Sequence, residues 1–346
     1  MNRVLRVMHT GERAARWNVA ATAALTELHG AGRIADTLRF HRYRESVLIG
    51  RHQSLGRAVH VGRCAQNGIE LARRVTGGGA VYMAPGALAW DIVIDRKAWR
   101  MGAADANDAI GKAVASGLAR LGLAARYRAE GEIEVGGRKV CGMSGYRNGD
   151  TLVCQGTILV DTDLGDMAHY LRLPAKDLRE ARRSLQDRVA TIGEFLGHRP
   201  REGELEAAIA CSLAQSLNCE MSDEAFSAEE QRLADRWHRD EIGTDAFVFD
   251  DRPLDAAAPM AVGRDGNIEA LITLHAGSDR RIDQIWLTGP FSATPSRTMR
   301  DLEAALRGLP VASAAQKATE FLVSHPVELR GASRVSVAAA IAKAQT

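Results

Sequence analysis

The most informative part of the sequence is the stretch Arg73-Arg74-Val75-Thr76-Gly77-Gly78-Gly79-Ala80-Val81-Tyr82, in which three glycines follow two arginines and precede a short apolar run. Glycine has no Cβ, so the backbone of such a triplet can adopt positive φ, and its N–H groups can closely approach an anion or a planar ligand. Neighbouring guanidinium groups can neutralise a phosphate or a carboxylate. The stretch therefore indicates one wall of a binding site for a nucleotide or an acyl phosphate. For three glycines alone, the alternative is a plain turn between two strands.

Three further motifs flank this stretch, and each combines a turn or a cationic group with a short apolar run. They are Ile49-Gly50-Arg51-His52-Gln53, then Gly136-Gly137-Arg138-Lys139-Val140-Cys141-Gly142, and then Gln155-Gly156-Thr157-Ile158-Leu159-Val160-Asp161. In this order the motifs resemble the lipoate-protein ligase A family, which shares its fold with octanoyltransferases and biotin protein ligases. The resemblance runs from Asn18 to about Gly197 and continues more faintly through the C-terminal region.

The resemblance implies an α+β fold: a catalytic domain of the biotin/lipoyl protein ligase type with a mixed or antiparallel sheet, followed by a small C-terminal α+β accessory domain. A length of 346 residues independently favours two domains. The polar segment 218–228 has no periodicity, which places the expected boundary near residue 222. Residues 1–222 are then the acyl-adenylate-forming catalytic domain and residues 223–346 the accessory domain.

Hydrophobic periodicity and turn residues predict the secondary structure. Helices are expected at 14–28, 58–67, 106–121, 167–171, 203–217, 228–239, 298–306 and 335–344. Strands are expected at 38–43, 46–50, 80–82, 87–94, 125–128, 132–135, 138–141, 152–159, 259–262, 268–276 and 282–288.

Composition narrows the class of protein. With 46% hydrophobic and 25% charged residues the chain is typical of a soluble globular protein, and a net charge of +2 gives no electrostatic reason to expect a nucleic-acid partner. The five cysteines include no CxxC pair, and neither an apolar signal region nor an apolar stretch long enough for a membrane span is present. We therefore expect a cytoplasmic protein that binds neither nucleic acid nor membrane.

Lys139 is the strongest catalytic candidate. Activation of a carboxylate by ATP brings two anions together, so a positioned ammonium is needed to offset their repulsion and to stabilise the developing negative charge. A single lysine is more often a solvated surface residue. The resemblance implies that Lys139 contacts the carboxylate and the adenylate phosphate, and the glycines around it agree with such a role.

The resemblance also implies a set of substrate-binding and nucleotide-binding residues. At least one of the two arginines is expected to face nucleotide phosphates, while the glycine loop lets the acyl chain and the adenylate pass against bare backbone. The set is Arg73, Arg74, Thr76, Gly77, Gly78, Gly79, Ala80, Val81, Tyr82, Arg147, Gly156 and Thr157. Arg147 matches a family arginine only after a shift of one residue, and no metal ligands are assigned.

The chain departs from the common family pattern in four places. Met83-Ala84 replaces a frequent His-Asp pair, and Cys154-Gln155 precedes Gly156 where Gln-His or His-His is frequent. His41 stands where some ligases have an aromatic wall, and residues 129–132 replace an acidic nucleotide loop. These changes leave the choice between lipoate and octanoate open.

The expected activity is that of a lipoate-protein ligase, which uses ATP and Mg²⁺ to convert lipoate or octanoate to acyl-AMP. The acyl group then passes to a lysine of an acceptor protein, either an E2 lipoyl domain or a glycine-cleavage H-like protein. Two alternatives remain: an octanoyl or lipoyl transferase that uses a thioester on Cys141 or Cys154, and a non-catalytic acyl-protein binding module. The C-terminal region favours the ligase, because transferases of this fold generally lack it.

Overall fold

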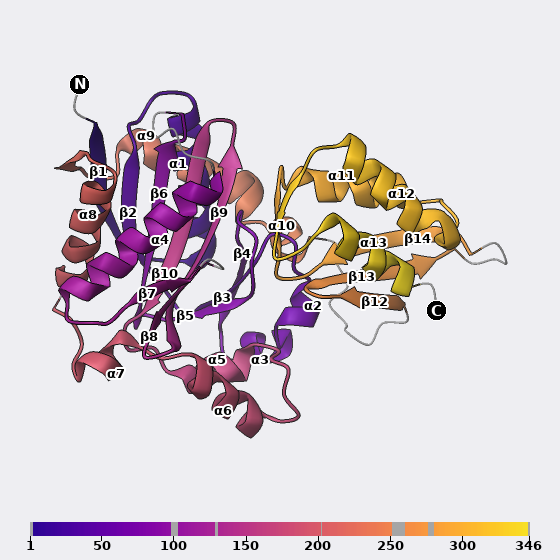
Figure 1. Cartoon of the computed structure of the whole chain (residues 1–346), viewed down its shortest axis with the longest axis horizontal. Helices are drawn as coiled ribbons and strands as arrows, with labels where there is room; N and C mark the ends of the chain where they lie inside the picture. The colour runs from indigo at the N-terminus through magenta and orange to yellow at the C-terminus, as the bar shows by residue number, and fades with distance from the viewer. Residues whose placement is uncertain are drawn as a thin grey trace. The chain divides into compact units, whose positions relative to one another are not determined.

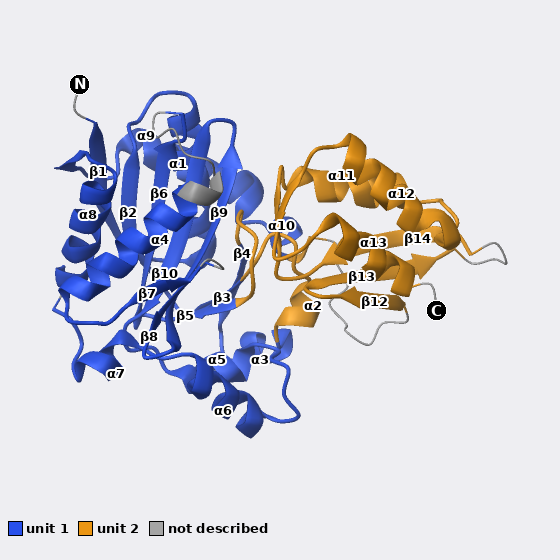
Figure 2. Cartoon of the chain, in the orientation of Figure 1, with its two compact units in different colours: residues 1–48, 60–73, 81–248 blue, residues 49–59, 74–80, 249–346 orange. Residues whose placement is uncertain are grey.

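The computed structural model describes residues 3–97, 103–128, 131–201, 203–250, 260–275 and 280–344. Its contacts divide the chain into two compact units, coloured separately in Figure 2. Unit 1 contains residues 1–48, 60–73 and 81–248, and unit 2 contains residues 49–59, 74–80 and 249–346. The expected domains, residues 1–222 and 223–346, differ from these units in two respects. Residues 223–248 pack in unit 1, and the segments 49–59 and 74–80 belong to unit 2.

Unit 1 is built on a mixed eight-stranded sheet with the strand order β11-β1-β2-β6-β10-β9-β8-β7 (Figure 1). The pairs β11–β1 and β1–β2 are parallel, and the pairs from β2 to β7 are antiparallel. The strands are β1 (Val4–Arg13), β2 (Thr37–Tyr43), β6 (Ala87–Asp95), β7 (Arg126–Arg128), β8 (Glu132–Val135), β9 (Arg138–Asn148), β10 (Thr151–Leu159) and β11 (Glu220–Asp223).

Helices cover both faces of this sheet. Helices α4 (Ala103–Arg120) and α8 (Glu204–Ser216) pack on one face over a large apolar core that includes Phe40 and Trp90. Helix α1 (Ala15–Gly30) lies on the other face, where it contacts β2, β6 and β10. Alternate residues of the strands therefore point to two different environments, an apolar core under α4 and α8 and a more polar layer under α1.

A second sheet of three short strands has the order β4-β3-β5, with β4 at Glu70–Arg73, β3 at Ser46–Ile49 and β5 at Val81–Met83. The shorter helices of unit 1 are α3 (Val61–Gln66), α5 (Leu164–Tyr170), α6 (Leu178–Arg188), α7 (Ile192–Leu196), α9 (Ala228–Trp237), the π-helical turn η1 (His238–Ile242) and α10 (Asp245–Phe249), which ends at the first residue of unit 2.

Unit 2 has its own α+β core. A three-stranded antiparallel sheet, β12 (Ala261–Asp265), β13 (Ile268–Leu274) and β14 (Ile282–Thr288), packs with α11 (Arg297–Leu306), α12 (Val311–Ser324) and α13 (Arg334–Lys343) around buried apolar residues. The unit also contains the strand pair β15 (Ser292–Thr294) and β16 (Glu328–Arg330) and the single-turn helix α2 (Leu55–Ala58). A separate apolar core is what an independent domain requires.

The predicted fold class is confirmed, whereas several predicted elements are wrong in detail. The helix expected at 58–67 is two short helices, α2 and α3, and the unstructured segment 218–228 contains β11. Strand β1 was not predicted, because the charged Arg6 does not fit the pattern of a buried strand. Arg6 is nevertheless buried, since it forms ion pairs with Glu224 and Glu230, more than two hundred positions away. The strands expected at 259–262 and 268–276 extend into residues outside the described part of the chain.

Among the residues that the structure describes, no helix combines the length and the apolar character needed to cross a membrane.

Candidate active site

A tight hairpin positions Lys139 at the start of β9. Gly136 and Gly137 connect β8 to β9 with φ values of 58° and 79°. Two successive positive φ angles are typical of a type I′ turn, which matches the twist of the flanking strands and favours glycine. The glycines before Lys139 therefore have a local structural function: they bring the first residues of β9 directly alongside β8.

A β-bulge then sets the direction of the Lys139 side chain. Cys141 pairs with Ile133 and Lys139 pairs with Glu134, so Val140 is an extra residue on β9. Val140 and Cys141 both point into the core under α4 and α8. The extra residue reverses the alternation and places Lys139 on the same face of the sheet as Gly142, which is how bulges commonly redirect side chains near functional sites.

The ammonium group of Lys139 is accessible and already paired with a carboxylate. Its Nζ lies 2.7 Å from Oε1 of Glu132, and the two side chains are 35% and 38% exposed. An ion pair at this exposure contributes little to stability. A Cβ at Gly142 would lie 3.0 Å from Cε of Lys139 and 3.1 Å from its Nζ, so the lysine needs bare backbone beneath it. Separation of Lys139 from Glu132 therefore costs little free energy.

Lys139 lies beside a partly exposed part of the sheet that we call the open strip, defined as Gly142 and Ser144 of β9 with Thr157 and Gln155 of β10. The antiparallel register pairs Gly142 with Thr157 and Ser144 with Gln155. Directly paired residues point to the same face of an antiparallel sheet. The open strip thus provides small and polar groups next to the cation, on the face that α1 covers further along.

The glycine loop belongs to unit 2 and is held by contacts within that unit. Gly78 has a φ of 94°, and its N–H donates to the carbonyl of Phe291 at 3.2 Å. A Cβ at Gly77 would collide with the backbone of Phe291 and Ser292. The Nη2 group of Arg74 donates to the carbonyls of Gly77 at 3.1 Å and Gly79 at 2.7 Å. Gly77 is thus required for close packing, Gly78 for its positive φ, and Arg74 stabilises the loop itself.

Arg73 has a different environment from the one expected. Its side chain is fully buried, and its guanidinium donates to the carbonyls of Phe247 at 3.0 Å and Val248 at 2.8 Å. These carbonyls lie at the end of α10. In this structure Arg73 thus anchors α10 and is not exposed to a nucleotide.

The remaining predicted residues are described within their own units, and in unit 1 Thr157 lies on the open strip opposite Gly142. Thr76 is buried, and its carbonyl accepts a hydrogen bond from the N–H of Arg51 at 2.9 Å, both in unit 2. Gly156 faces the apolar core, where a Cβ would collide with the indole of Trp90. Arg147 lies on β9 eight residues from Lys139, on the order of 26 Å at about 3.3 Å per residue.

Residues 80–82 form the end of the glycine loop and most of β5. Ala80 is partly exposed, while Val81 and Tyr82 pair with Leu48 and Val47 of β3. Burial raises the pKa of the Tyr82 hydroxyl, which lies 3.3 Å from Oε1 of Glu45. These residues therefore form the framework of the small sheet.

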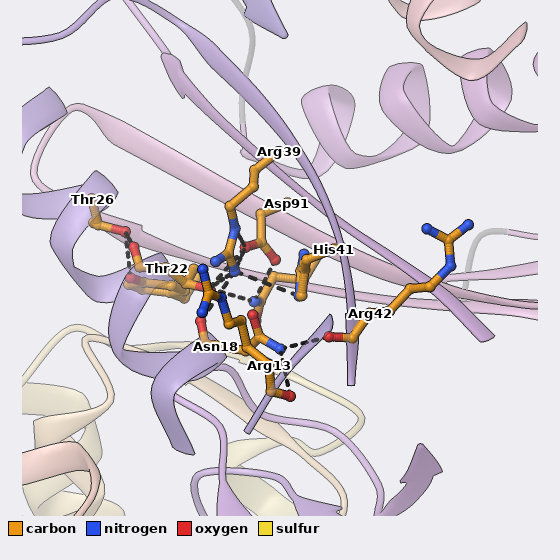
Figure 3. A network of polar contacts seen from close by, with 10 residues as sticks. Arg13, Asn18, Thr22, Thr26, Arg39, His41, Arg42 and Asp91 are labelled. Carbon is orange, nitrogen blue, oxygen red and sulfur yellow. Dashed lines mark hydrogen bonds and ion pairs between the residues drawn. The ribbon is translucent and has the colours of Figure 1, made fainter. Parts of the chain in front are cut away.

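A buried polar network, of which the sequence motifs singled out only His41, lies between β2, β6 and α1 (Figure 3). Arg39 donates to Oδ2 of Asp91 through Nε at 3.0 Å and Nη2 at 2.5 Å, and Thr22 donates to the same oxygen at 2.8 Å. Gln155 of the open strip donates to Oδ1 of Asp91 at 2.8 Å. Burial alone would raise the pKa of Asp91, but the Arg39 guanidinium and these donors hold it below its usual value. The network is thus an ion pair linked to the exposed face through Gln155.

His41 extends the network along β2. Burial, with a smaller contribution from Arg39, lowers the pKa of His41 to about 3, so its imidazole is neutral at pH 7. The sequence did contain a signal: Arg39 and His41 alternate with Leu38 and Phe40, and Asp91 interrupts an apolar strand. Two basic residues and one acidic residue on the inner faces of predicted strands indicate a buried polar cluster.

The two cysteines considered as nucleophiles are packing residues in this structure. Cys141 is fully buried, which raises the pKa of its thiol to about 12, and Cys154 is 1% exposed. Burial of Cys141 therefore disfavours its reactive thiolate. Within the described ranges, no group of three or more His, Cys, Asp or Glu side chains is arranged to hold a metal ion.

The fold and the motifs define a class of protein. Residues 14–214, more than half of the chain, match the model of the lipoyl protein ligase A/B catalytic domain, and the chain belongs to this family.

Relatives in this family carry two different activities in their names. The lipoate-protein ligase A subunit 1 of Thermoplasma acidophilum is 29% identical over 208 residues, which cover 57% of this chain and 78% of the relative. An octanoyltransferase LipM from Symbiobacterium thermophilum is 26% identical over 253 residues, which cover 66% of this chain and 92% of the relative. Membership of the family therefore supports an enzyme but does not by itself select the reaction.

Solved structures of lipoate-protein ligases are similar to this chain. A lipoate-protein ligase A bound with ATP has a TM-score of 0.63 at 26% identity, covering 72% of this chain and 99% of that structure. The bipartite lipoate protein ligase of Thermoplasma acidophilum, described together with its E2 lipoyl domain, has a TM-score of 0.62 at 25% identity, covering 72% of this chain and 96% of that structure.

Proposed function

We propose that this protein is an ATP-dependent lipoate-protein ligase that activates lipoate or octanoate as acyl-AMP. The observation that carries the proposal is the bulge at Val140, which aims an accessible ammonium along an open strip while it buries Cys141 in the core. This arrangement suits electrostatic catalysis at phosphate and carboxylate oxygens, and it does not suit a thiolate nucleophile.

In the first step an oxygen of the substrate carboxylate attacks the α-phosphorus of ATP, and the bond to pyrophosphate breaks. The ammonium of Lys139 leaves Glu132 and stabilises the negative charge on the reacting oxygens. Removal of one donor of this kind typically costs about 10²–10³ in rate. Mg²⁺ would accompany ATP as the counter-ion of its phosphates.

In the second step the neutral ε-amine of an acceptor lysine attacks the acyl carbon, AMP leaves, and the amine loses a proton to solvent. Lys139 would again stabilise the charge that develops on the carbonyl oxygen. We propose an E2 lipoyl domain or a glycine-cleavage H-like protein as the acceptor. The similar ligase described with its E2 lipoyl domain supports the first of these partners.

Several further assignments belong to this proposal. They are a cytoplasmic location, the functional division into residues 1–222 and 223–346, and adenylate binding by the glycine loop, including at least one contact of Arg73 or Arg74 with phosphate. Because Arg73 is buried on carbonyls and Arg74 holds the loop, a phosphate contact by either residue would require it to exchange its present partners.

The deciding experiment supplies an apo lipoyl domain and compares two acyl donors. We expect octanoate or lipoate with ATP and Mg²⁺ to increase the mass of the lipoyl domain and to release one AMP per acyl group. We expect octanoyl-acyl carrier protein without ATP to give no product. Product formation from the carrier protein alone would contradict the ligase proposal.

An octanoyltransferase is the second candidate, because relatives named LipM align over most of their own length. It requires an acyl-thioester on the enzyme. We expect the double variant Cys141→Ala/Cys154→Ala to retain ATP-dependent acylation, and intact-protein mass spectra to show no hydroxylamine-labile adduct in the wild type. An adduct that disappears with either cysteine would favour the transferase, and absence of turnover with both donors would favour a non-catalytic binding module.

A further inference from the structure

Glu132 is a carboxylate that borders the place where the proposed chemistry occurs. It lies at the start of β8 and pairs with Gly142 of β9. The next pair in the register, Ile133 with Cys141, points into the apolar core. Because neighbouring residues of a strand point to opposite faces, Glu132 lies on the face that carries Lys139 and the open strip.

Strand β8 carries two carboxylates on this face, and they have different partners. Oε2 of Glu134 accepts a hydrogen bond from Nε of Arg128 at 2.8 Å, which joins it to the neighbouring strand β7. Oε1 of Glu132 lies 2.7 Å from Nζ of Lys139. The proposed mechanism moves the Lys139 ammonium to the substrate oxygens and leaves the ion pair of Glu134 unchanged. Glu132 is therefore the carboxylate whose partner departs when the substrate is bound.

The backbone that carries this ion pair is held on two sides. Strand β9 pairs with β8. In addition, Val189, directly after α6, forms a parallel bridge with Lys139, and the N–H of Ala190 donates to the carbonyl of Lys139 at 2.9 Å. The two charged groups therefore separate by side-chain rotation alone, and Glu132 stays close to a substrate that is bound at the ammonium.

The second step of the proposed reaction releases a proton that needs an acceptor. When the nitrogen of the acceptor lysine bonds to the acyl carbon, it becomes positively charged, and one of its N–H protons must leave to give the amide. A positioned side chain that takes such a proton in the transition state typically contributes about 10²–10⁴ in rate. The ammonium of Lys139 cannot do so, because it has no lone pair.

The distances place Glu132 within reach of this proton. A carbonyl oxygen that is hydrogen-bonded to Lys139 lies about 2.9 Å from Nζ, and the acyl carbon is about 1.2 Å from that oxygen. Because Nζ and Oε1 are 2.7 Å apart, the acyl carbon lies roughly 4–6 Å from Oε1. A nitrogen about 3 Å from the acyl carbon, ready to attack, can therefore hydrogen-bond to Oε1 at about 3 Å.

We propose that Glu132 is the general base of the acyl-transfer step. The inference rests on the proposed function, because it assumes that acyl-AMP is bound with its carbonyl oxygen at Lys139. The neutral amine of the acceptor lysine forms a bond to the acyl carbon, and one of its N–H bonds breaks as the proton passes to Oε1 of Glu132. The bond between the acyl carbon and the phosphate oxygen then breaks, and AMP leaves with that electron pair.

Glu132 then returns the proton to solvent, since its side chain is 38% exposed. One ion pair thus supplies two catalytic groups. Lys139 and Glu132 neutralise each other before the substrate binds, and afterwards the ammonium stabilises negative charge while the carboxylate accepts the proton.

The test measures the two steps separately with the full chain. ATP–pyrophosphate exchange with octanoate reports the first step, and single-turnover transfer from preformed octanoyl-AMP to an apo lipoyl domain reports the second. Glu132→Gln keeps the shape of the side chain and an oxygen that accepts from Lys139, but an amide does not serve as a base. We expect exchange within about threefold of the wild type and a loss of about 10²–10⁴ in the rate of transfer.

Glu134→Gln is the matched control. It makes the same chemical change two residues further along the same face, at the carboxylate that pairs with Arg128. Both rates should stay at the wild-type level in this variant.

Glu132→Ala provides a second test that does not depend on the fit of glutamine. Added acetate can occupy the space of the missing carboxylate and act as the base, so we expect the transfer rate of this variant to rise with acetate concentration. Trifluoroacetate has the same charge but is a far weaker base, and we expect it to restore no activity. Equal rescue by both anions would show that only the negative charge matters and would overturn the inference.

The remaining outcomes distinguish the inference from the proposed function. Wild-type transfer by Glu132→Gln would overturn the inference and leave the ligase proposal intact. Equal loss of exchange and transfer in Glu132→Gln would also overturn it, because the carboxylate would then act in binding ATP or the adenylate. Failure of the wild type to exchange pyrophosphate with octanoate or lipoate would overturn the proposed function itself.

Discussion

Lys139 and Gly142 lie on the same face of β9, although they are three positions apart in the chain, because Val140 forms a bulge between them. In a regular strand an odd separation would place the two residues on opposite faces. Lys139 would then point into the apolar core beside Cys141, where an ammonium group is costly. The bulge therefore converts a buried position into an accessible one at the edge of the open strip.

Replacement of Lys139 tests its catalytic role. We expect Lys139→Ala to lose about 10²–10³ in the rate of acyl transfer, because a positioned cation is lost from both transition states. The circular dichroism spectrum and the unfolding midpoint should change little, since both side chains of the ion pair with Glu132 are more than a third exposed. Lys112→Ala, on the exposed side of α4, is the control. Retention of more than about a tenth of the activity would remove Lys139 from this role.

Gly142→Ala tests the support beneath the lysine. The new Cβ would lie 3.0 Å from Cε of Lys139 and force this flexible side chain to move. We expect about a tenfold loss of kcat/KM, by analogy with the effect of small misplacements of catalytic groups, with little change in stability. Gly62→Ala is a control without neighbours within 4 Å and should be fully active. Equal activity of the two variants would show that the position of Lys139 is not critical.

Gly78→Val tests the glycine loop. Gly78 has a φ of 94°, which a β-branched residue resists. We expect a folded protein that loses binding of a non-hydrolysable lipoyl-AMP analogue in calorimetry, with far less effect on binding of the acceptor domain. Gly32→Val is the matched control, because its φ is 68° and nothing lies within 4 Å of a Cβ there. Unchanged analogue affinity in folded Gly78→Val would mean that the triplet is only a turn.

His41 should make the stability of the protein sensitive to acid. Its folded-state pKa is about 3, whereas an unfolded histidine titrates near 6.5. The unfolded state therefore binds more protons between these values. The contribution of His41 to stability is complete above about pH 6.5 and falls toward pH 3, by up to about 1.4 kcal/mol per pH unit.

Urea unfolding at pH 7.0, 5.5 and 4.5 checks this expectation. The free energy of unfolding of His41→Phe should decline less steeply between pH 7.0 and 4.5 than that of the wild type. His9→Phe removes an exposed histidine for comparison and should follow the wild type. Parallel curves for the wild type and His41→Phe would show that His41 is accessible to protons in the folded protein.

The sequence by itself determined the family and the α+β class, and it singled out Lys139 as the leading catalytic candidate. These depend on local chemistry: glycines that permit a type I′ turn, a lysine beside them, and apolar runs with strand or helix periodicity. Such signals need only neighbouring residues and are readable without a structure. The resemblance to ligases added the expected activity, which no local pattern specifies.

Only the tertiary structure decided what the other candidates do. Arg73 precedes the glycine loop in the sequence, but its guanidinium binds carbonyls at positions 247 and 248, and Gly156 makes room for Trp90. The partners of Arg39 are likewise Asn18, Thr22 and Asp91, which belong to other elements. Burial and pairing at long range set the role of each of these groups, because a charge that is isolated in the sequence becomes structural once the fold supplies its counter-charge or its acceptors.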